Sequence, residues 1–190
     1  MNEITIEINK CVEVLKQGGV ILYPTDTVWG IGCDATNEQA VDKVYKLKKR
    51  EDSKSMIILL DNEAKLLSYI REVPQLAWDL IDYAETPLTI IYPDAKNLAQ
   101  NVIGGDKTIG IRITRDEFCR KLIEKYRKPI VSTSANITGN AAPAAFSMIE
   151  KEILEGIDYI VNLRQNEITV ASPSTIIKLG MRGEFKIIRK

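Results

Sequence analysis

Short apolar runs alternate with helical patterns along most of this chain, and no other feature constrains the fold as strongly. Residues 20–23 and 56–60 are long enough for buried strands and rich in Val, Ile and Leu. Apolar residues between positions 8 and 15 recur at helical spacing and end at Gly18-Gly19, a typical helix stop. Such alternation favours a layered α/β domain in which helices cover a sheet.

The remaining predicted elements extend the same pattern to the end of the chain. Further strands are predicted at residues 88–92, 108–112, 129–131, 159–161, 175–177 and 185–188. Further helices are predicted after capping boxes that begin at Thr36 and Thr114, after Pro74, and over residues 145–154. Adjacent strand runs near both ends favour a mixed sheet over a purely parallel one. No repeat or linker divides the 190 residues, so we expect one domain over residues 1–190.

Composition narrows the classes of function. Lys+Arg and Asp+Glu number 26 each, so no overall charge draws the chain to nucleic acid or membrane. The chain has no histidine, which excludes a Ser-His-Asp triad, a His-ligated metal and a histidine general base. Three scattered cysteines favour neither zinc nor a disulfide framework, and they fit a reducing compartment. With no signal-peptide pattern and no apolar run near the roughly 18 residues of a membrane span, we expect a cytoplasmic protein without membrane contact.

Residues 24–32 read Pro-Thr-Asp-Thr-Val-Trp-Gly-Ile-Gly and directly follow a predicted buried strand. Ligands of open α/β sheets bind at strand ends, and threonine hydroxyls with free backbone N–H groups suit phosphate or carboxylate oxygens. Pro, Asp and Gly are also ordinary turn formers, and Asp26 could close a turn through its side chain. Taken alone, the segment favours a turn.

The run from Lys46 to Lys54 is strongly basic and follows the predicted helix that begins near Thr36. One interpretation is a polyphosphate clamp, in which lysines act as point charges and Arg50 as a planar fork. The other is a solvated helix C-terminus, where cations are favourable. Taken alone, the segment favours a solvated surface.

Arg112 interrupts an apolar strand, and a buried arginine needs a partner. A substrate carboxylate and an internal salt bridge are equally good partners at this stage. Residues 132–140, Ser-Thr-Ser-Ala-Asn-Ile-Thr-Gly-Asn, follow another strand and suit either an anion-binding loop or the N-cap of a helix. Without a histidine to activate it, a serine nucleophile is not expected.

Taken together, these segments resemble the YrdC/TsaC family of threonylcarbamoyl-adenylate synthases. The resemblance runs from about Gly19 to the end of the chain, and residues 24–32 are its most specific part. The other matching segments, in family order, are Lys48-x-Arg50 with Lys54, Thr108-x-x-x-Arg112, Ser132-x-Ser134-Ala135-Asn136-x-x-Gly139 and Ser174-Thr175-Ile176. Joint agreement of five segments outweighs the separate alternatives. Departures at Ser55, residues 85–86 and residues 113–114 affect the expected loop shapes only.

The resemblance implies a short, single-domain form with a YrdC-like fold: a twisted mixed sheet flanked by helices around a deep central cavity. It implies that L-threonine, bicarbonate and ATP condense to threonylcarbamoyl-adenylate and pyrophosphate. Mg²⁺ would be held mainly by the ATP phosphates, without a metal site of the protein's own. A downstream threonylcarbamoyl transferase complex would modify the adenosine beside the anticodon of tRNA, and direct contact with RNA is left open.

The resemblance also implies roles residue by residue. The residues expected at the ATP phosphates are Lys48, Arg50 and Lys54, the first two as catalytic residues. Those expected elsewhere in the nucleotide site are Thr108, Ser134, Asn136 and Arg189. Those expected at threonine are Thr27, Arg112, Ser132 and Ser174, with Arg112 and Ser174 at its carboxylate.

Two other functions compete with this interpretation. A carbamoyl-adenylate-forming domain shares the fold family but usually belongs to larger proteins with zinc-finger-like segments, which the scattered cysteines do not support. A non-catalytic RNA-binding or ribosome-maturation module is weakened as a sole role by the zero net charge, because phosphate contacts dominate RNA affinity.

Overall fold

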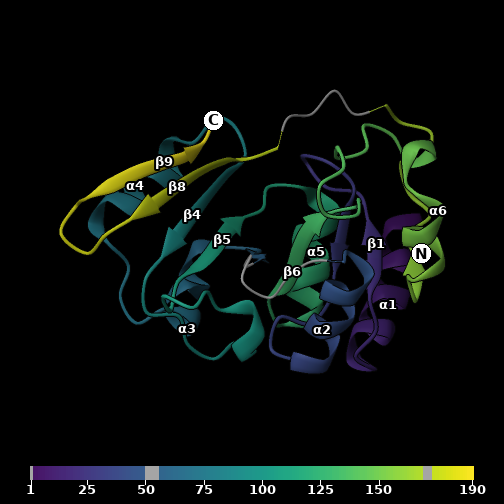
Figure 1. Ribbon diagram of the computed structural model, residues 1–190, viewed down its shortest axis with the longest axis horizontal. Coiled ribbons are helices and arrows are strands. Elements are labelled where there is room, and N and C mark those ends of the chain that lie inside the picture. The colour runs from purple at the N-terminus through teal and green to yellow at the C-terminus, as the bar shows by residue number, and fades with distance from the viewer. Residues whose placement is uncertain (1, 50–55, 169–172) are drawn as a thin grey trace.

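The computed structural model describes residues 2–49, 56–168 and 173–190, and its elements follow the predicted alternation (Figure 1). The strands are β1 (Ile21–Tyr23), β2 (Gly30–Gly32), β3 (Ile57–Leu60), β4 (Leu88–Tyr92), β5 (Ile109–Ile113), β6 (Ile130–Ser134), β7 (Tyr159–Ile160), β8 (Thr175–Leu179) and β9 (Phe185–Arg189). The α-helices are α1 (Glu3–Lys16), α2 (Glu38–Leu47), α3 (Leu66–Tyr69), α4 (Gln75–Tyr83), α5 (Glu117–Tyr126) and α6 (Lys151–Glu155). Short 3₁₀ turns are η1 (Glu63–Lys65), η2 (Gln100–Val102) and η3 (Phe146–Met148).

Within the described ranges, nine strands form one sheet in the order β7-β1-β2-β6-β3-β5-β4-β8-β9. The pairs β1–β7, β3–β5 and β4–β8 are parallel, and the other neighbours are antiparallel. The prediction of a mixed sheet is therefore confirmed. In Figure 1 the β8–β9 hairpin lies at the end of the sheet opposite α1 and α6.

Side chains that alternate between the two faces of the sheet explain why helices cover both of these faces. Ile21 and Tyr23 belong to an apolar cluster with α1 and α5, whereas Leu22 belongs to a second cluster with α2. Successive side chains of a strand point to opposite faces, so β1 contributes to both layers of core. All three cysteines are buried. Among the described residues, no helix has the length and apolar character that a membrane span needs.

Both predicted capping boxes are wrong, because the N-cap of α2 lies one residue after Thr36 and the N-cap of α5 lies two residues after Thr114. Asn37 caps α2 by accepting from the Ala40 N–H, and the Thr36 hydroxyl instead donates to an Asp34 oxygen at 2.7 Å. Asp116 caps α5 by accepting from the N–H of the third residue beyond it, at 2.9 Å. The Thr114 hydroxyl only accepts from the Asp116 N–H, at 3.3 Å. Short acidic and amide side chains are stronger N-caps than threonine.

Two further predictions need correction. The helix expected over residues 145–154 is divided into η3 and α6, with extended backbone at Ile149 and Glu150 between them. The Glu150 carboxylate accepts from the Ile137 N–H at 2.9 Å, which holds this break against the 134–140 loop. Strand β2 was not predicted, because its sequence Gly-Ile-Gly has low strand propensity. The backbone alone pairs it with β1 and β6.

Candidate functional site

Thr25 organises the loop between β1 and β2. Its hydroxyl donates to the Val28 carbonyl at 2.8 Å and accepts from the Thr27 N–H at 3.0 Å. The turn interpretation is thus correct in part, but Thr25 and not Asp26 closes the turn. Since the Thr25 proton is used, the Thr27 hydroxyl must donate in the 2.9 Å bond between these two side chains. The remaining lone pairs of Thr27 face Arg112.

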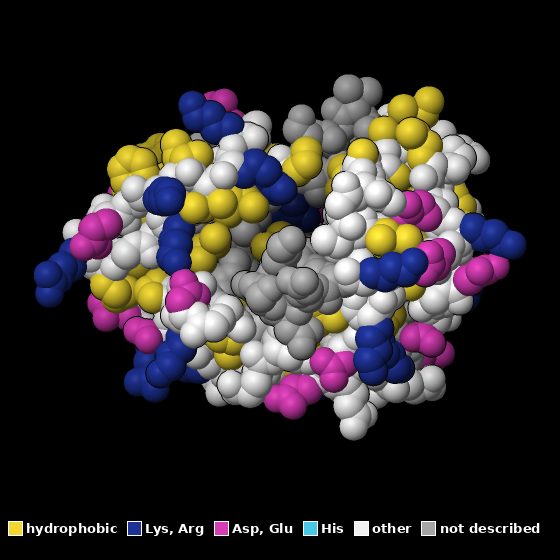
Figure 2. Space-filling view, viewed as in Figure 1, with side chains coloured by type: hydrophobic (Ala, Val, Ile, Leu, Met, Phe, Trp, Pro, Cys, Tyr) yellow, Lys and Arg dark blue, Asp and Glu magenta, His cyan; other side chains and the backbone are white. Residues whose placement is uncertain are grey.

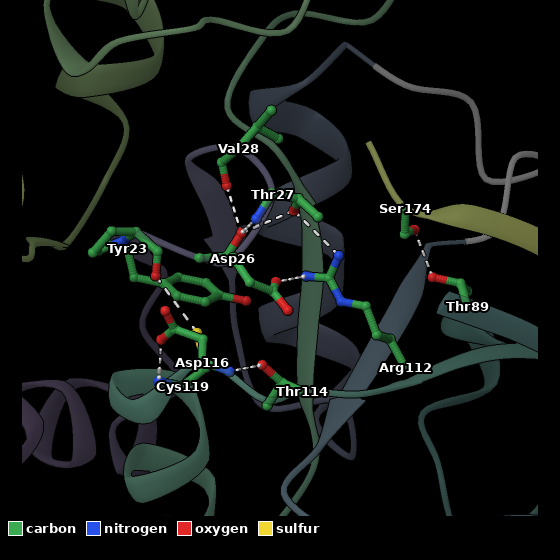
Figure 3. A network of polar contacts seen from close by, with 12 residues as sticks. Tyr23, Asp26, Thr27, Val28, Thr89, Arg112, Thr114, Asp116, Cys119 and Ser174 are labelled. Atoms are coloured by element: carbon green, nitrogen blue, oxygen red, sulfur yellow. Dashed lines mark hydrogen bonds and ion pairs between the residues drawn. The ribbon is translucent and has the colours of Figure 1, made fainter. Parts of the chain in front are cut away.

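Arg112 lies at the centre of this arrangement and is buried, with 3% of its surface exposed. One terminal nitrogen donates to the Thr27 hydroxyl at 3.1 Å, and the other lies 3.3 Å from an oxygen of Asp26 (Figure 3). Its Nε atom is buried and, among the described residues, has no hydrogen-bond partner. The internal salt bridge therefore exists, yet it leaves a guanidinium N–H available for another acceptor.

The Asp26 carboxylate is not strongly held as an anion. Burial raises its pKa, and the attraction of Arg112 only partly offsets this effect, so the pKa stays above its ordinary value. One of its oxygens is buried without a hydrogen bond among the described residues. The ion pair with Arg112 is therefore open to exchange of partners.

Ser174 and Arg189 close the opposite side of the site. The hydroxyls of Ser174 and Thr89 share a 2.8 Å hydrogen bond. Two nitrogens of Arg189 donate to the Ser174 carbonyl at 3.0 and 2.8 Å. Burial, and then repulsion by Arg112, lower the pKa of Arg189. Two guanidinium groups thus share one region, which favours an anionic ligand.

A cavity of about 360 Å³ joins these groups. Figure 2 shows the surface hollowed near the middle of the molecule, with basic side chains visible inside. Seven of the predicted site residues line this Arg112 cavity: Thr27, Arg112, Ser132, Ser134, Asn136, Ser174 and Arg189. They come from the β1–β2 loop, β5, β6 and the loop after it, the segment just before β8, and β9. The volume suits a small-molecule ligand.

Lys48 fixes the loop after β6 through hydrogen bonds to its backbone. This residue is 2% exposed, and its ammonium donates to the carbonyls of Ser134 and Asn136 at 2.5 Å each. The Asn136 amide donates to the carbonyls of Ile137 and Asn140, at 2.9 and 2.8 Å. No helix follows directly, so the N-cap alternative for residues 132–140 is wrong.

Four predicted residues are not placed in the cavity by the described structure. The expected contact of Lys48 with phosphate stays a prediction, since its ammonium is engaged with the loop. Thr108 lies outside the residues that line the cavity and donates to Asp106 at 2.6 Å. Arg50 and Lys54 fall outside the described residues.

The structure also adds residues that sequence reasoning missed. Asp26 was considered only as a turn former, yet it is the ionic partner of Arg112. Asn140 lines the cavity together with Ile57. Trp29 of the β1–β2 loop is buried and packs on Phe146 with ring centroids 5.0 Å apart. Within the described part of the chain, no cluster of three or more His, Cys, Asp or Glu is placed to hold a metal ion.

Comparison with known proteins gives concordant results. The Sua5/YciO/YrdC family model, described as telomere recombination, matches residues 13–190. A threonylcarbamoyl-AMP synthase of Pseudoalteromonas translucida is 34% identical over 180 residues, covering 93% of this chain and 95% of the relative. A putative threonylcarbamoyl-AMP synthase of Methanocaldococcus jannaschii is 36% identical, covering 91% of this chain and 82% of the relative.

Among solved structures, P. abyssi Sua5 complexed with L-threonine superposes with a TM-score of 0.83 at 29% identity. The match covers 94% of this chain and 52% of that one, so this chain spans about half of its length. The mixed sheet flanked by helices is thus the fold of these structures. With the family model matching most of its length, the chain belongs to the Sua5/YciO/YrdC family.

Proposed function

We propose that this protein is a threonylcarbamoyl-AMP synthase, which condenses L-threonine, bicarbonate and ATP to threonylcarbamoyl-adenylate and pyrophosphate. The observation that carries the proposal is the buried Arg112 guanidinium, which lines one cavity with Ser174 and Thr27 and whose Nε–H has no partner among the described residues. The name of the relatives and the threonine complex of P. abyssi Sua5 support the same assignment.

The threonine carboxylate is proposed to bind Arg112 and Ser174. A buried charged donor without an acceptor is unfavourable, and a carboxylate supplies a charge-assisted bond. Thr27 and Ser132 line the same cavity and offer hydroxyls to the amino acid. Threonine would then lie against β5, with its amine free to react.

The nucleotide is proposed to occupy the part of the cavity lined by Ser134, Asn136 and Arg189. Arg189 supplies a guanidinium for phosphate oxygens, and Asn136 has a buried side-chain oxygen without a partner among the described residues. Arg50 and Lys54 are proposed at the phosphates on the family resemblance. Mg²⁺ would accompany ATP through its phosphates.

The chemistry agrees with a site that has no histidine. The threonine amine attacks the carbon of bicarbonate, or of an activated form of it, and water or the activating group leaves to give a carbamate. A carbamate oxygen then attacks the α-phosphorus of ATP, and pyrophosphate leaves. Such a reaction depends on alignment of the reactants and on neutralised phosphate charge. Arg112 and Arg189 are proposed to supply both.

The product would serve a threonylcarbamoyl transferase complex that modifies tRNA. We propose that the protein acts in the cytoplasm as one domain over residues 1–190.

The test is pyrophosphate release from ATP with each substrate omitted in turn. Release should require L-threonine and bicarbonate together, and labelled bicarbonate should enter the adenylate. Equal release without threonine would refute the proposal.

A further inference from the structure

A second cavity, of about 520 Å³, lies on the other face of β5. Ile111 and Ile113 line this cavity, whereas Arg112 between them lines the first one. Leu88, Ile90 and Tyr92 of β4 complete its floor, as alternation along a strand requires. The volume is in the range of sites that bind small organic molecules. We call it the β4–β5 cavity.

The β4–β5 cavity has an apolar floor and an acidic rim. Five carboxylates line it, against two guanidiniums; the carboxylates are Asp26, Asp61, Glu63, Asp82 and Glu85. Lys65 offsets one of these carboxylates, because its ammonium lies 2.8 Å from an oxygen of Asp61, and four carboxylates then face two guanidiniums. The guanidinium of Arg115 donates to the carbonyls of Ala84 and Ile81 at 2.7 and 3.1 Å. The excess of negative charge disfavours an anion and favours a cation with an apolar body.

Tyr92 gives an independent sign of a ligand. It lines the β4–β5 cavity and is 1% exposed, and among the described residues its hydroxyl makes no hydrogen bond. Burial raises the pKa of this hydroxyl well above its ordinary value, so it stays neutral. A phenol oxygen at the wall of a cavity can accept a bond from an ammonium N–H.

We propose that the β4–β5 cavity binds an aliphatic ammonium ion. The hydrocarbon part lies on the β4–β5 floor, and the ammonium lies between the Tyr92 hydroxyl and the rim carboxylates. This site is separate from the Arg112 cavity and is no part of the adenylate-forming reaction.

Asp26 connects the two cavities. Its carboxylate lines the β4–β5 cavity, and one of its oxygens lies 3.3 Å from Arg112. An ammonium ion beside Asp26 competes with Arg112 for this carboxylate, which leaves the guanidinium more available to an anion in the Arg112 cavity. Ammonium and threonine therefore each strengthen the binding of the other, since such coupling is reciprocal. This coupling rests on the proposed function, whereas the ammonium site does not.

The site is tested by calorimetric titration of the full chain with n-pentylammonium chloride, using 1-pentanol and pentanoate as probes of the same length. Pentylammonium should bind saturably, and the neutral and anionic probes at least about tenfold more weakly. Tyr92→Phe should weaken pentylammonium by about threefold to tenfold. Tyr83→Phe is the matched control, because Tyr83 is exposed on α4, and it should leave the affinity unchanged.

Equal binding of pentanol, or no saturable binding of pentylammonium, would overturn the site. If Tyr92→Phe does not fold, judged by circular dichroism, the exposed rim variant Glu85→Gln takes its place, and unchanged affinity there counts against the site. For the coupling, saturating pentylammonium should tighten L-threonine binding by about fivefold in the unmodified protein and not in Asp26→Asn. Ammonium binding without this change refutes the coupling alone. Failure of threonine to bind at all refutes the proposed function and leaves the ammonium site standing.

Discussion

Replacing Arg112 with alanine should separate the two roles of this residue, in binding and in stability. Removal of the guanidinium deletes the proposed charge-assisted bond to the threonine carboxylate, which is worth about 1.5–3 kcal/mol. The dissociation constant for L-threonine should therefore rise by roughly 10- to 150-fold. Isothermal titration of both proteins with L-threonine measures this change directly.

The same substitution leaves the Asp26 carboxylate without its ion-pair partner. The side chain of Asp26 is 21% exposed, so we expect a loss of about 2 kcal/mol in unfolding free energy, below the cost of breaking a fully buried pair. Adding Asp26→Asn should recover most of this stability, because the uncompensated charge is gone. It should not recover threonine affinity.

The loss of stability should also depend on pH. Burial already holds the Asp26 pKa above its ordinary value, and Arg112 opposes this effect. Without Arg112 the pKa rises further, so the folded state takes up a proton more readily than the unfolded chain, and its stability falls as pH rises. The difference between the two proteins in urea denaturation should therefore shrink on acidification, as Asp26 becomes protonated. Unchanged threonine affinity, or no recovery of stability in the double variant, would refute this account of Arg112.

Three further predictions concern residues that shape the site. Lys48→Met removes two short hydrogen bonds to backbone carbonyls and should lower the unfolding free energy, measured in urea, by about 3 kcal/mol. Lys49 forms only an exposed ion pair, so the control variant Lys49→Met should lower the unfolding free energy by less than about 1 kcal/mol. Equal effects of the two substitutions would contradict the structural role of Lys48. Gly32→Ala would place a Cβ 2.6 Å from a backbone carbonyl oxygen and should reduce the thermal unfolding temperature by an amount equivalent to about 1–3 kcal/mol, while Gly105→Ala meets open space and should be close to neutral. Burial raises the pKa of Asp34, but hydrogen bonds from neighbouring donors outweigh burial and hold the pKa below its ordinary value, so this carboxylate stabilises the fold above its unfolded pKa and loses that contribution as pH falls through the folded pKa. Asp34→Asn should therefore reduce stability near pH 7 and flatten the acid limb of a pH titration of stability; an acid limb as steep as before would count against this assignment.

Helices and strands could be predicted wherever the spacing of the apolar residues and the length of the run indicated the same kind of element. The strands around Ile58, Ile90 and Ile111 were found because each is an apolar run that the sheet buries. Strand β2 was missed because its residues lack strand propensity and pair through the backbone alone. The exact caps of α2 and α5 depended on which of several neighbouring polar side chains was already engaged, and spacing does not reveal this.

The site was predictable as a set of residues and not as a network. Seven predicted residues line one cavity, since each stands in a polar segment at or beside a strand. The partnership of Asp26 with Arg112 could not be read from the sequence, because 85 positions separate Arg112 from the neighbouring Thr27 and only the folded sheet brings them together. The burial of Lys48 could not be predicted either. A basic segment of this kind is typical of solvated surface, and only the fold brings the Lys48 ammonium to the 134–140 loop.

The position of Arg189 has a consequence for how the protein is made. Its guanidinium is tied to the Ser174 carbonyl from the outermost strand β9, while Thr27 and Arg112 come from far earlier in the chain. During synthesis, a ribosome-bound chain that has not yet released β9 lacks one wall of the Arg112 cavity. We therefore expect affinity for the proposed carboxylate ligand only after β9 has joined the sheet. Ligand binding would then report that the β8–β9 hairpin has folded.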